Sequence, residues 1–300
     1  MSEGLQFNTT AGNVLPTLEK RAKRASLPLR TLRHPLGRIG LVLFLALLIC
    51  ALAAAFIAPY DPAVQDYDFL LSPPSPQHWF GTDDLGRDIL SRVIYGAQTS
   101  FEVMLSSIAA ALILGVPIGL ATGYFGGWFD DVVMRIMDAL LAFPTLILAL
   151  AIVAALGPGL VNAIIALAIV NVPAFARLVR GQVLSLRDLE FVQAARAVGM
   201  TDLRVLCRHI WPSVRGSVVI YASLRASTAL ITESALSFLG LGVQPPTPSW
   251  GSMLAVSMQY FDAWWMGVFP GVAVFATVLS LNFLGDALRD SLDSNLSQRG

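Results

Sequence analysis

The sequence alternates between long apolar runs and shorter polar connections. Six runs hold about 20 or more mostly apolar residues, the length that an α-helix needs to cross a bilayer. They cover about 39–58, 101–123, 132–156, 160–179, 218–239 and 264–284. This pattern predicts an all-α polytopic membrane protein with six transmembrane helices.

Composition supports the membrane class. Of the 300 residues, 55% are hydrophobic and 13% are charged, and the mean hydropathy is +0.67. A soluble domain of this size needs more polar surface. About forty polar or basic residues precede the first run, which is too long for the start of a cleavable signal peptide. We therefore expect the first run to remain as an anchor.

Glycine and proline mark turns and helix contacts. Short glycine-containing turns at 126–127 and 157–159 predict two tight antiparallel hairpins. Gly115, Gly119 and Gly123 are spaced four apart on one helical face, where a neighbouring backbone can approach closely. Kinks are expected at Pro117, Pro144 and Pro173, which either shape the bundle or serve as gating hinges.

Basic residues near the runs are distributed unevenly, which predicts orientation. Six spans place the N-terminal tail and the segment between the fourth and fifth runs on one side, and both are rich in arginine. The connections at 59–100, 157–159 and 240–263 fall on the other side and hold only Arg87 and Arg92. Both termini are therefore expected in the cytoplasm.

The polar segment between the fourth and fifth runs is the most informative. Residues 193–212 read QAARAVGMTDLRVLCRHIWP. The central glycine and the closing proline predict two short helices joined at Gly199. The first helix is expected to present Ala194 and Ala195 as a flat face to another protein, which would pass force into the bilayer.

This segment resembles the EAA loop of ABC-importer permeases, which reads E-A-A, three residues, G, about ten residues, then I-x-P. Gln193 stands where the signature has Glu, and Trp211 stands where it often has Leu. Glu190, one turn earlier on the same face, is a candidate to supply the missing charge. The resemblance implies that the ATPase-coupling residues are Glu190, Gln193, Ala194, Ala195, Arg196, Gly199 and Pro212.

Three further stretches narrow the resemblance. They begin at Gly81 (GTDDLGRD), at Glu233 (ESALSFLGLG, continuing to PPTPSWG) and at Asn282 (NFLGDALRD). Together with the EAA-like loop they resemble the second, C-type permease subunit of dipeptide, oligopeptide and nickel importers. This implies a type I ABC importer permease (MetI-like) core of five helices with one peripheral transmembrane helix, in a bacterial inner membrane.

The resemblance also implies partners. These are a homologous second permease subunit, two ABC ATPase subunits or domains that hold ATP and Mg²⁺, an extracytoplasmic solute-binding protein, and membrane lipid, but no nucleic acid. The expected organisation is a cytoplasmic tail at 1–38, the peripheral helix at 39–58, an external loop with an amphipathic helix at 59–100, the core at 101–286 with its cytoplasmic coupling loop at 180–215, and a C-terminal tail at 287–300.

The external loop carries a charged motif of Asp83, Asp84, Arg87 and Asp88. We expect Thr82 or Asp83 to cap a short amphipathic helix, on which Arg87 pairs with Asp83 or Asp84. Self-pairing that orders the loop and direct contact with substrate both remain open. The proline-rich stretch at 245–248 is not helical and forms either a rigid lip or a passive turn.

Polar residues inside the apolar runs are costly in a bilayer and often functional. Candidates for the pathway or a gate are Arg225, Thr232, Glu233 and Asn171. Arg135 and Asp138 are expected to form a local pair. The asparagines at 162, 171 and 282 are expected to make hydrogen bonds between helices.

Motifs for chemistry within the chain are lacking. There is no G-x-x-x-x-G-K-[ST] loop, no H-E-x-x-H and no cysteine cluster, and the three histidines are far apart. We therefore expect no catalytic residue, metal or cofactor in this chain. Permeases of this kind also carry nickel or glutathione-like solutes. An ion-coupled secondary transporter and an intramembrane enzyme are the alternatives from other classes.

Overall fold

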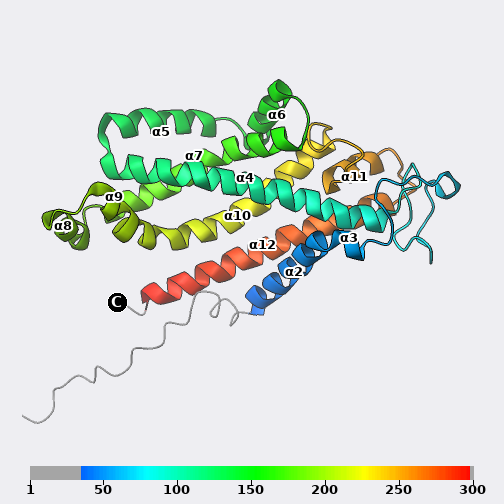
Figure 1. Cartoon of the computed structure of the whole chain (residues 1–300), viewed down its shortest axis with the longest axis horizontal. Coiled ribbons are helices and arrows are strands. Elements are labelled where there is room, and N and C mark those ends of the chain that lie inside the picture. The colour runs from blue at the N-terminus through cyan, green and yellow to red at the C-terminus, as the bar shows by residue number, and fades with distance from the viewer. Residues whose placement is uncertain (1–34, 298–300) are drawn as a thin grey trace, which may run out of the picture.

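Long helices run side by side in an elongated bundle (Figure 1). The computed structural model describes residues 35–297, and no β-strand occurs in that range. Residues 1–34 of the predicted N-terminal tail and residues 298–300 of the predicted C-terminal tail lie outside the described residues.

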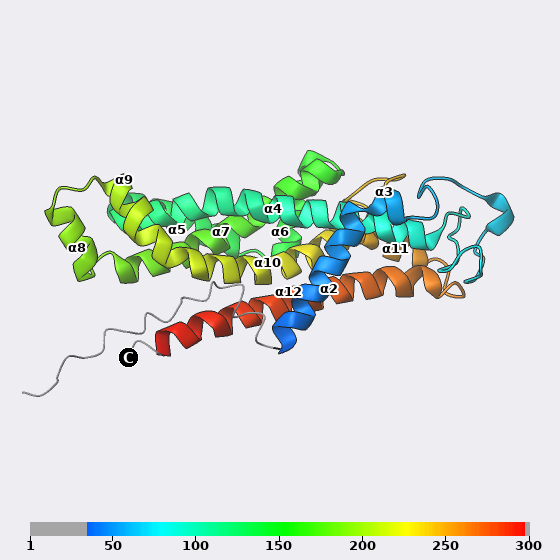
Figure 2. The same ribbon diagram turned by 60° about the horizontal axis from the view of Figure 1, so that its bottom comes forward.

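The first apolar run forms α2 (Pro35–Leu52) and the short α3 (Ala54–Ile57). The helix thus begins four residues before the predicted boundary and is interrupted near its end. A Cβ atom on Gly40 would lie 2.7 Å from Cβ of Phe283, so α2 and α12 (Trp265–Ser297) cross in close contact. Figure 2 shows α2 crossing the near face of the bundle on its outside, as predicted for a peripheral helix.

The second predicted span is much longer than its apolar run. Helix α4 (Ile89–Phe125) has 37 residues and, at 1.5 Å per residue, is on the order of 55 Å long. Residues 89–100 were expected in the external loop but are helical, because Asp88 supplies the N-cap by accepting a hydrogen bond from the Ser91 amide.

Close packing between α4 and α7 (Leu160–Leu186) confirms the predicted glycine contact. A Cβ atom on Gly115, Gly119 or Gly123 would lie within 3 Å of α7, the nearest atoms being the carbonyl oxygens of Val172 and Ala176 and Cβ of Val183. The missing side chains therefore let two backbones approach as in other small-residue membrane contacts.

The third predicted span is broken into two helices. Helices α5 (Gly127–Leu141) and α6 (Thr145–Leu156) meet at 93°. Pro144 lies at the break, where its ring removes a backbone donor and disfavours helix in the preceding residue. Pro117 and Pro173 lie inside helices that continue past them.

The fifth span begins earlier than predicted. Helix α9 (Asp202–Val205), the π-helical segment η2 (Leu206–Ile210) and α10 (Trp211–Phe238) follow one another without a break. After α10 come α11 (Trp250–Ser257) and α12, which extends through Ser297 and so makes most of the predicted C-terminal tail helical.

Within residues 35–297, α2, α4, α7 and α12 are long and apolar enough to cross a membrane, and the bent pair α5–α6 has the length and composition of one broken span or of a re-entrant loop. Helix α10 has 28 residues, enough to cross a bilayer. Its charged residues Arg215, Arg225 and Glu233 make it more polar than the others. It packs against α12, α4 and α7. Glu233 is buried and Arg225 is half-buried in this packing, whereas Arg215 is exposed.

Candidate functional site

The loop between α7 and α10 contains two short helices, α8 (Glu190–Ala197) and α9, which lie at one end of the bundle (Figure 1). Gly199 joins them with φ +80°, a conformation that glycine adopts without steric cost. The predicted pair of helices joined at Gly199 is confirmed. Most of the predicted 180–215 loop is helical, because α7 continues to Leu186 and helix resumes at Asp202.

One face of α8 is exposed and the other is packed. Glu190, Gln193 and Ala194 are exposed, whereas Val192 and Ala195 are buried against the ends of α7, α9 and α10. The prediction that both alanines form an outward face is therefore wrong for Ala195, which is 6% exposed. Its burial fixes the orientation of the helix.

Exposed apolar side chains lie on α8, at its two caps and on α9. Leu189, Phe191, Val198 and Leu203 are between 42% and 76% exposed. An exposed apolar patch at the polar end of the helix bundle is typical of a surface that contacts another protein. The sequence analysis overlooked these four residues, although Phe191 directly precedes buried Val192 and the helical period therefore turns it away from the buried side of α8.

The polar coupling candidates differ in their surroundings. The Gln193 side-chain amide donates to the Asp188 carbonyl at 3.0 Å, and Glu190 lies exposed one turn earlier. Arg196 instead turns back onto α4, with its guanidinium carbon 4.6 Å from the centre of the Tyr124 ring. Whether Glu190 replaces the signature glutamate stays a prediction.

Pro212 does not close the segment. It lies exposed in the first turn of α10 and the helix continues through it. In η2 just before it, the Trp211 amide bonds to the Leu206 carbonyl, five residues back. This wider turn and its place near the start of α10 allow the proline without breaking the helix.

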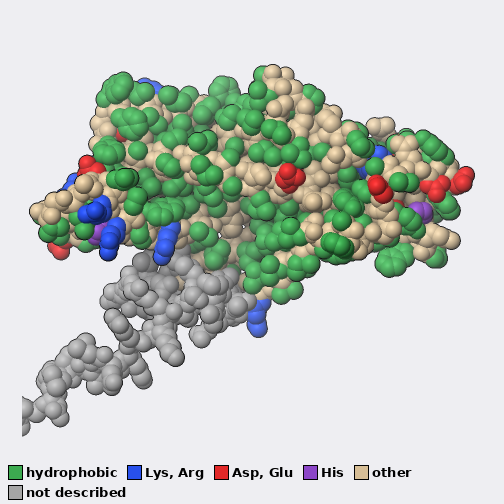
Figure 3. All heavy atoms as spheres, in the orientation of Figure 1, with side chains coloured by type: hydrophobic (Ala, Val, Ile, Leu, Met, Phe, Trp, Pro, Cys, Tyr) green, Lys and Arg blue, Asp and Glu red, His purple; other side chains and the backbone are tan. Residues whose placement is uncertain are grey.

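Charge separates the two ends of the molecule. Arginine side chains gather at the α8–α9 end in Figure 3, where Arg196, Arg204, Arg208 and Arg215 are exposed. The opposite end shows carboxylates, and Asp61 and Asp68 are exposed there. Hydrophobic side chains cover the surface between them, as expected for the part in contact with lipid.

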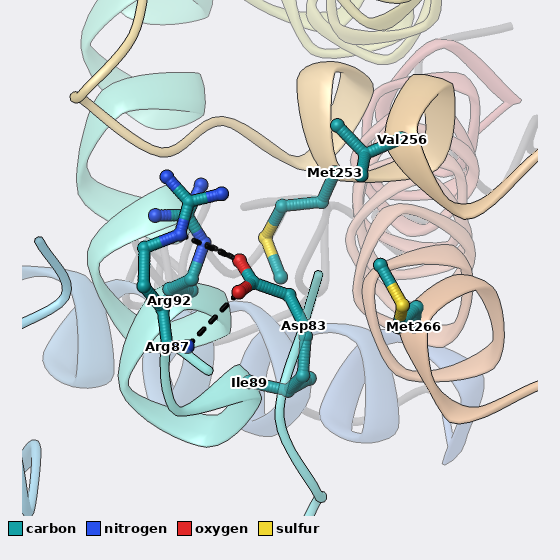
Figure 4. Close-up of a pocket in the computed structure, with 7 residues that line it drawn as sticks. All are labelled: Asp83, Arg87, Ile89, Arg92, Met253, Val256 and Met266. Atoms are coloured by element: carbon teal, nitrogen blue, oxygen red, sulfur yellow. Dashed lines mark hydrogen bonds and ion pairs between the residues drawn. The ribbon is translucent and has the colours of Figure 1, made fainter. Parts of the chain in front are cut away.

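The charged motif at the opposite end forms a buried network rather than a helix. Asp83, 3% exposed, accepts hydrogen bonds from the amides of Leu85 and Arg87, each at 2.9 Å. Its other carboxylate oxygen lies 2.7 Å from Nε of Arg87 and 3.4 Å from Nε of Arg92 (Figure 4). The amphipathic helix predicted here is wrong, because Gly81 and Gly86 have positive φ and turn the chain.

Asp88 links this network to α4. One carboxylate oxygen lies 2.9 Å from Nδ1 of His78, and the other accepts from the amide and the hydroxyl of Ser91, each at 2.8 Å. Asp84 is more exposed and lies 3.7 Å from Arg87. Partial burial, and then the neighbouring Asp83 carboxylate, raise the pKa of Asp84 above its usual value. These contacts support self-pairing over direct contact with substrate.

The pathway candidates do not converge. Arg225 donates to the hydroxyl of Tyr221 at 3.0 Å and is half-buried, and the Thr232 hydroxyl donates to the Thr228 carbonyl in its own helix. Glu233 is 1% exposed and bonds to Ser237 at 2.8 Å. It therefore faces the packed interior of this chain rather than an open surface.

Two predictions about polar pairs inside the spans were wrong. Asn171 and Asn282 bond to carbonyl groups of their own helices, at Leu167 and Val278. Asp138 pairs with Arg177 of α7 rather than with Arg135, because a contact between helices replaces the local one.

The predicted hydrogen bond between helices is confirmed for Asn162. The side-chain amide of Asn162 in α7 donates to the carbonyl groups of Leu156 and Gly157 at the end of α6, at 3.1 and 3.0 Å.

Among residues 35–297 no group of His, Cys, Asp or Glu side chains is arranged to hold a metal ion.

Comparison with known proteins agrees with this arrangement. A family model described as "Binding-protein-dependent transport system inner membrane component" matches residues 115–298. A second, described as "N-terminal TM domain of oligopeptide transport permease C", matches residues 29–74. Together the two models cover α2, α3 and the chain from the middle of α4 onward.

Similar curated proteins extend over most of the chain. The dipeptide transport system permease protein DppC of Alkalihalophilus pseudofirmus is 45% identical over 265 residues, 88% of this chain and 87% of that protein. The di/tripeptide transport system permease protein DppC of Pseudomonas aeruginosa is 45% identical over 271 residues, 88% and 89% of the two chains. The glutathione transport system permease protein GsiD of Escherichia coli O157:H7 is 46% identical over 266 residues, 88% of each.

A solved structure shares the fold. An inward-facing structure of the MetNI methionine ABC transporter has a TM-score of 0.55 and 20% identity, and the match covers 68% of this chain and 97% of that one. At this identity the likeness concerns the arrangement of helices alone.

Proposed function

This chain belongs to the family of binding-protein-dependent transport system inner membrane components, and from that premise we propose that it imports short peptides as one of two permease subunits of an ATP-driven transporter. The relatives named for dipeptide, di/tripeptide and glutathione transport support a short peptide as solute. Glutathione is itself a tripeptide, so all three names share a peptide backbone with charged ends.

The exposed face of α8 is the observation that carries the proposal. Ala194 is small and exposed among Leu189, Phe191 and Val198, while buried Ala195 and Val192 hold the helix against the bundle. A short helix fixed in this way suits docking into a cleft of an ATPase subunit. Movement of that ATPase would then displace the bundle instead of bending a loose loop.

In this mechanism the chain performs no chemistry of its own. ATP and Mg²⁺ are held by two partner ATPase subunits, which close when ATP binds and draw the two coupling helices together. The permease pair then changes from inward-open to outward-open by movement of rigid helices. A solute-binding protein delivers peptide at the end that carries Asp83 and Asp88.

Orientation follows from the same assignment. The α8–α9 end, with its exposed arginines, lies in the cytoplasm, and so do both termini. A second, homologous permease subunit supplies the other half of the pathway. This chain's own pathway candidates, Arg225 and Thr232, lie on α10 within the core.

The test replaces Ala194 with arginine in the assembled transporter. We expect Ala194→Arg to leave the amount of chain in the membrane unchanged, because the residue is exposed. Uptake of a labelled dipeptide should fall at least about tenfold as the bulky charge prevents docking. The control is Ser185→Arg, which adds the same charge at an exposed position of α7 and should retain uptake.

Normal uptake by Ala194→Arg would contradict docking through α8. Uptake that follows an ion gradient and survives depletion of ATP would favour a secondary transporter. Turnover of a substrate by the purified chain without partners would favour an intramembrane enzyme.

A further inference from the structure

The two ends of helix α4 are each fixed by a polar cluster, at opposite ends of the bundle. It starts at the Asp88 cap and ends at Phe125, beside the α8–α9 loop (Figure 1). It also forms the extensive glycine-lined contact with α7. Displacement of one end of such a continuous helix is carried to the other.

Tyr124 fixes the end near α8. Its side chain is 6% exposed, and its hydroxyl donates to a carboxylate oxygen of Asp202 at 2.7 Å. The same hydroxyl accepts from Nε of Arg196 at 3.2 Å, and the Arg196 guanidinium lies over the ring. One side chain thus makes two charge-assisted hydrogen bonds, which are stronger than neutral ones.

These two partners lie on opposite sides of the Gly199 joint. Arg196 is in the last turn of α8, and Asp202 is the first residue of α9. A Cβ atom on Gly199 would have no neighbour within 4 Å, so packing does not support the joint itself. Tyr124 therefore holds both arms of the loop to α4. Arg187 adds a third contact just before α8, donating to the Gly123 carbonyl at 3.2 Å.

The other end of α4 is bound to the elements of the opposite face. Asp88 caps the helix, Arg92 pairs with Asp83 of the preceding loop, and the indole of Trp250 in α11 donates to the Val93 carbonyl at 3.0 Å. Movement of α4 would reach the loop at 58–88 and α11 together.

We propose that Tyr124 is the positioning residue that transmits displacement of α8 to α4, and through α4 to the loops at the opposite end. This inference rests on the proposed docking of an ATPase on α8. It assigns to Tyr124 a role in the coupling of ATP hydrolysis to transport, not in docking. Removing its hydroxyl should leave the ATPase bound but make hydrolysis less productive.

The experiment uses the complete transporter in proteoliposomes, with Cys50 and Cys207 replaced by serine and Ala194→Cys added as a crosslinking site. Tyr124→Phe removes only the hydroxyl and keeps the buried ring. We expect the crosslink to the ATPase to persist while labelled dipeptide imported per ATP hydrolysed falls about five- to tenfold. Ile113→Leu, at a 71% exposed position of the same helix, is the control and should leave this ratio unchanged.

A second pair of variants separates a specific bond from general loosening. Asp202→Ala should lower the ratio as Tyr124→Phe does, and Asp202→Asn, which keeps an oxygen acceptor, should restore most of it. The double variant Tyr124→Phe with Asp202→Ala should be little worse than Tyr124→Phe alone, because the bond between the two residues is already lost in that single variant.

The outcomes separate the two hypotheses. An unchanged ratio in Tyr124→Phe, with the crosslink present, would overturn the role of Tyr124 and leave docking intact. Fully additive losses in the double variant would also overturn it. Absence of the crosslink in the chain that keeps Tyr124 would instead refute the proposed function.

Discussion

Adding a single methyl group to Gly119 tests whether contact between α4 and α7 sets the stability of the core. A Cβ atom there would lie 2.5 Å from the Ala176 carbonyl oxygen and 2.7 Å from Cβ of Val179. Ordinary contact begins near 3.4 Å, so the helices must separate locally by about 0.9 Å. The nearest atom is backbone, so a change of rotamer cannot relieve the clash.

The expected change in the free energy of unfolding of Gly119→Ala is the sum of two opposing effects. Overpacking of this kind costs about 1–3 kcal/mol, and a backbone clash belongs in the upper half of that range. Replacing glycine by alanine inside a helix contributes about 1 kcal/mol of stability. Gly119→Ala should therefore lower the free energy of unfolding by about 1–2 kcal/mol.

Gly181 on α7 provides the matched control. It is exposed, and a Cβ atom there would meet nothing within 4 Å. Gly181→Ala should raise the free energy of unfolding by up to about 1 kcal/mol. The difference between the two variants cancels the helix propensity and isolates the steric cost, at about 2–3 kcal/mol.

The assay is equilibrium unfolding of the purified chain in mixed micelles with increasing SDS, followed by circular dichroism. Equal shifts of the unfolding midpoint in Gly119→Ala and Gly181→Ala would refute the reasoning. It would mean that α4 and α7 can separate at no cost, and that the glycines do not determine their contact.

Two further predictions concern buried carboxylates. Asp83→Ala should destabilise the loop at 58–88 by about 3–5 kcal/mol, because Arg87 and Arg92 lose the carboxylate they share while both remain buried. Asp84→Ala should destabilise the same loop by less than about 1 kcal/mol. Limited proteolysis in vesicles measures both, and equal protection of the two variants would contradict the network. Glu233→Gln should keep the hydrogen bond with Ser237 and lower the free energy of unfolding by less than about 1.5 kcal/mol. Glu233→Ala should lower it by about 2–4 kcal/mol, because it leaves a cavity and an unpaired Ser237 hydroxyl. SDS unfolding compares the two, and equal midpoints would show that the carboxyl position contributes no packing.

Sequence patterns of short range determined much of this molecule. Apolar runs of membrane-spanning length predicted the helical class, because each backbone group in a bilayer must be bonded within its own helix. The spacing of Gly115, Gly119 and Gly123 predicted a helix contact, and Gly199 predicted the joint between α8 and α9. All these features depend on residues within a few turns of one another.

Only the tertiary structure decided features that join distant residues. The side of α8 that Ala195 buries depends on the ends of α7, α9 and α10, and the partner of Asp138 is 39 residues away. The 82–88 motif looked helical by spacing, yet Asp83 and Asp88 instead serve as acceptors for a turn and for the start of α4. Tyr124 is unremarkable in sequence because its two partners lie 72 and 78 residues further along the chain. Local periodicity cannot predict such contacts, because only the packing of the helices brings these distant residues within hydrogen-bond distance.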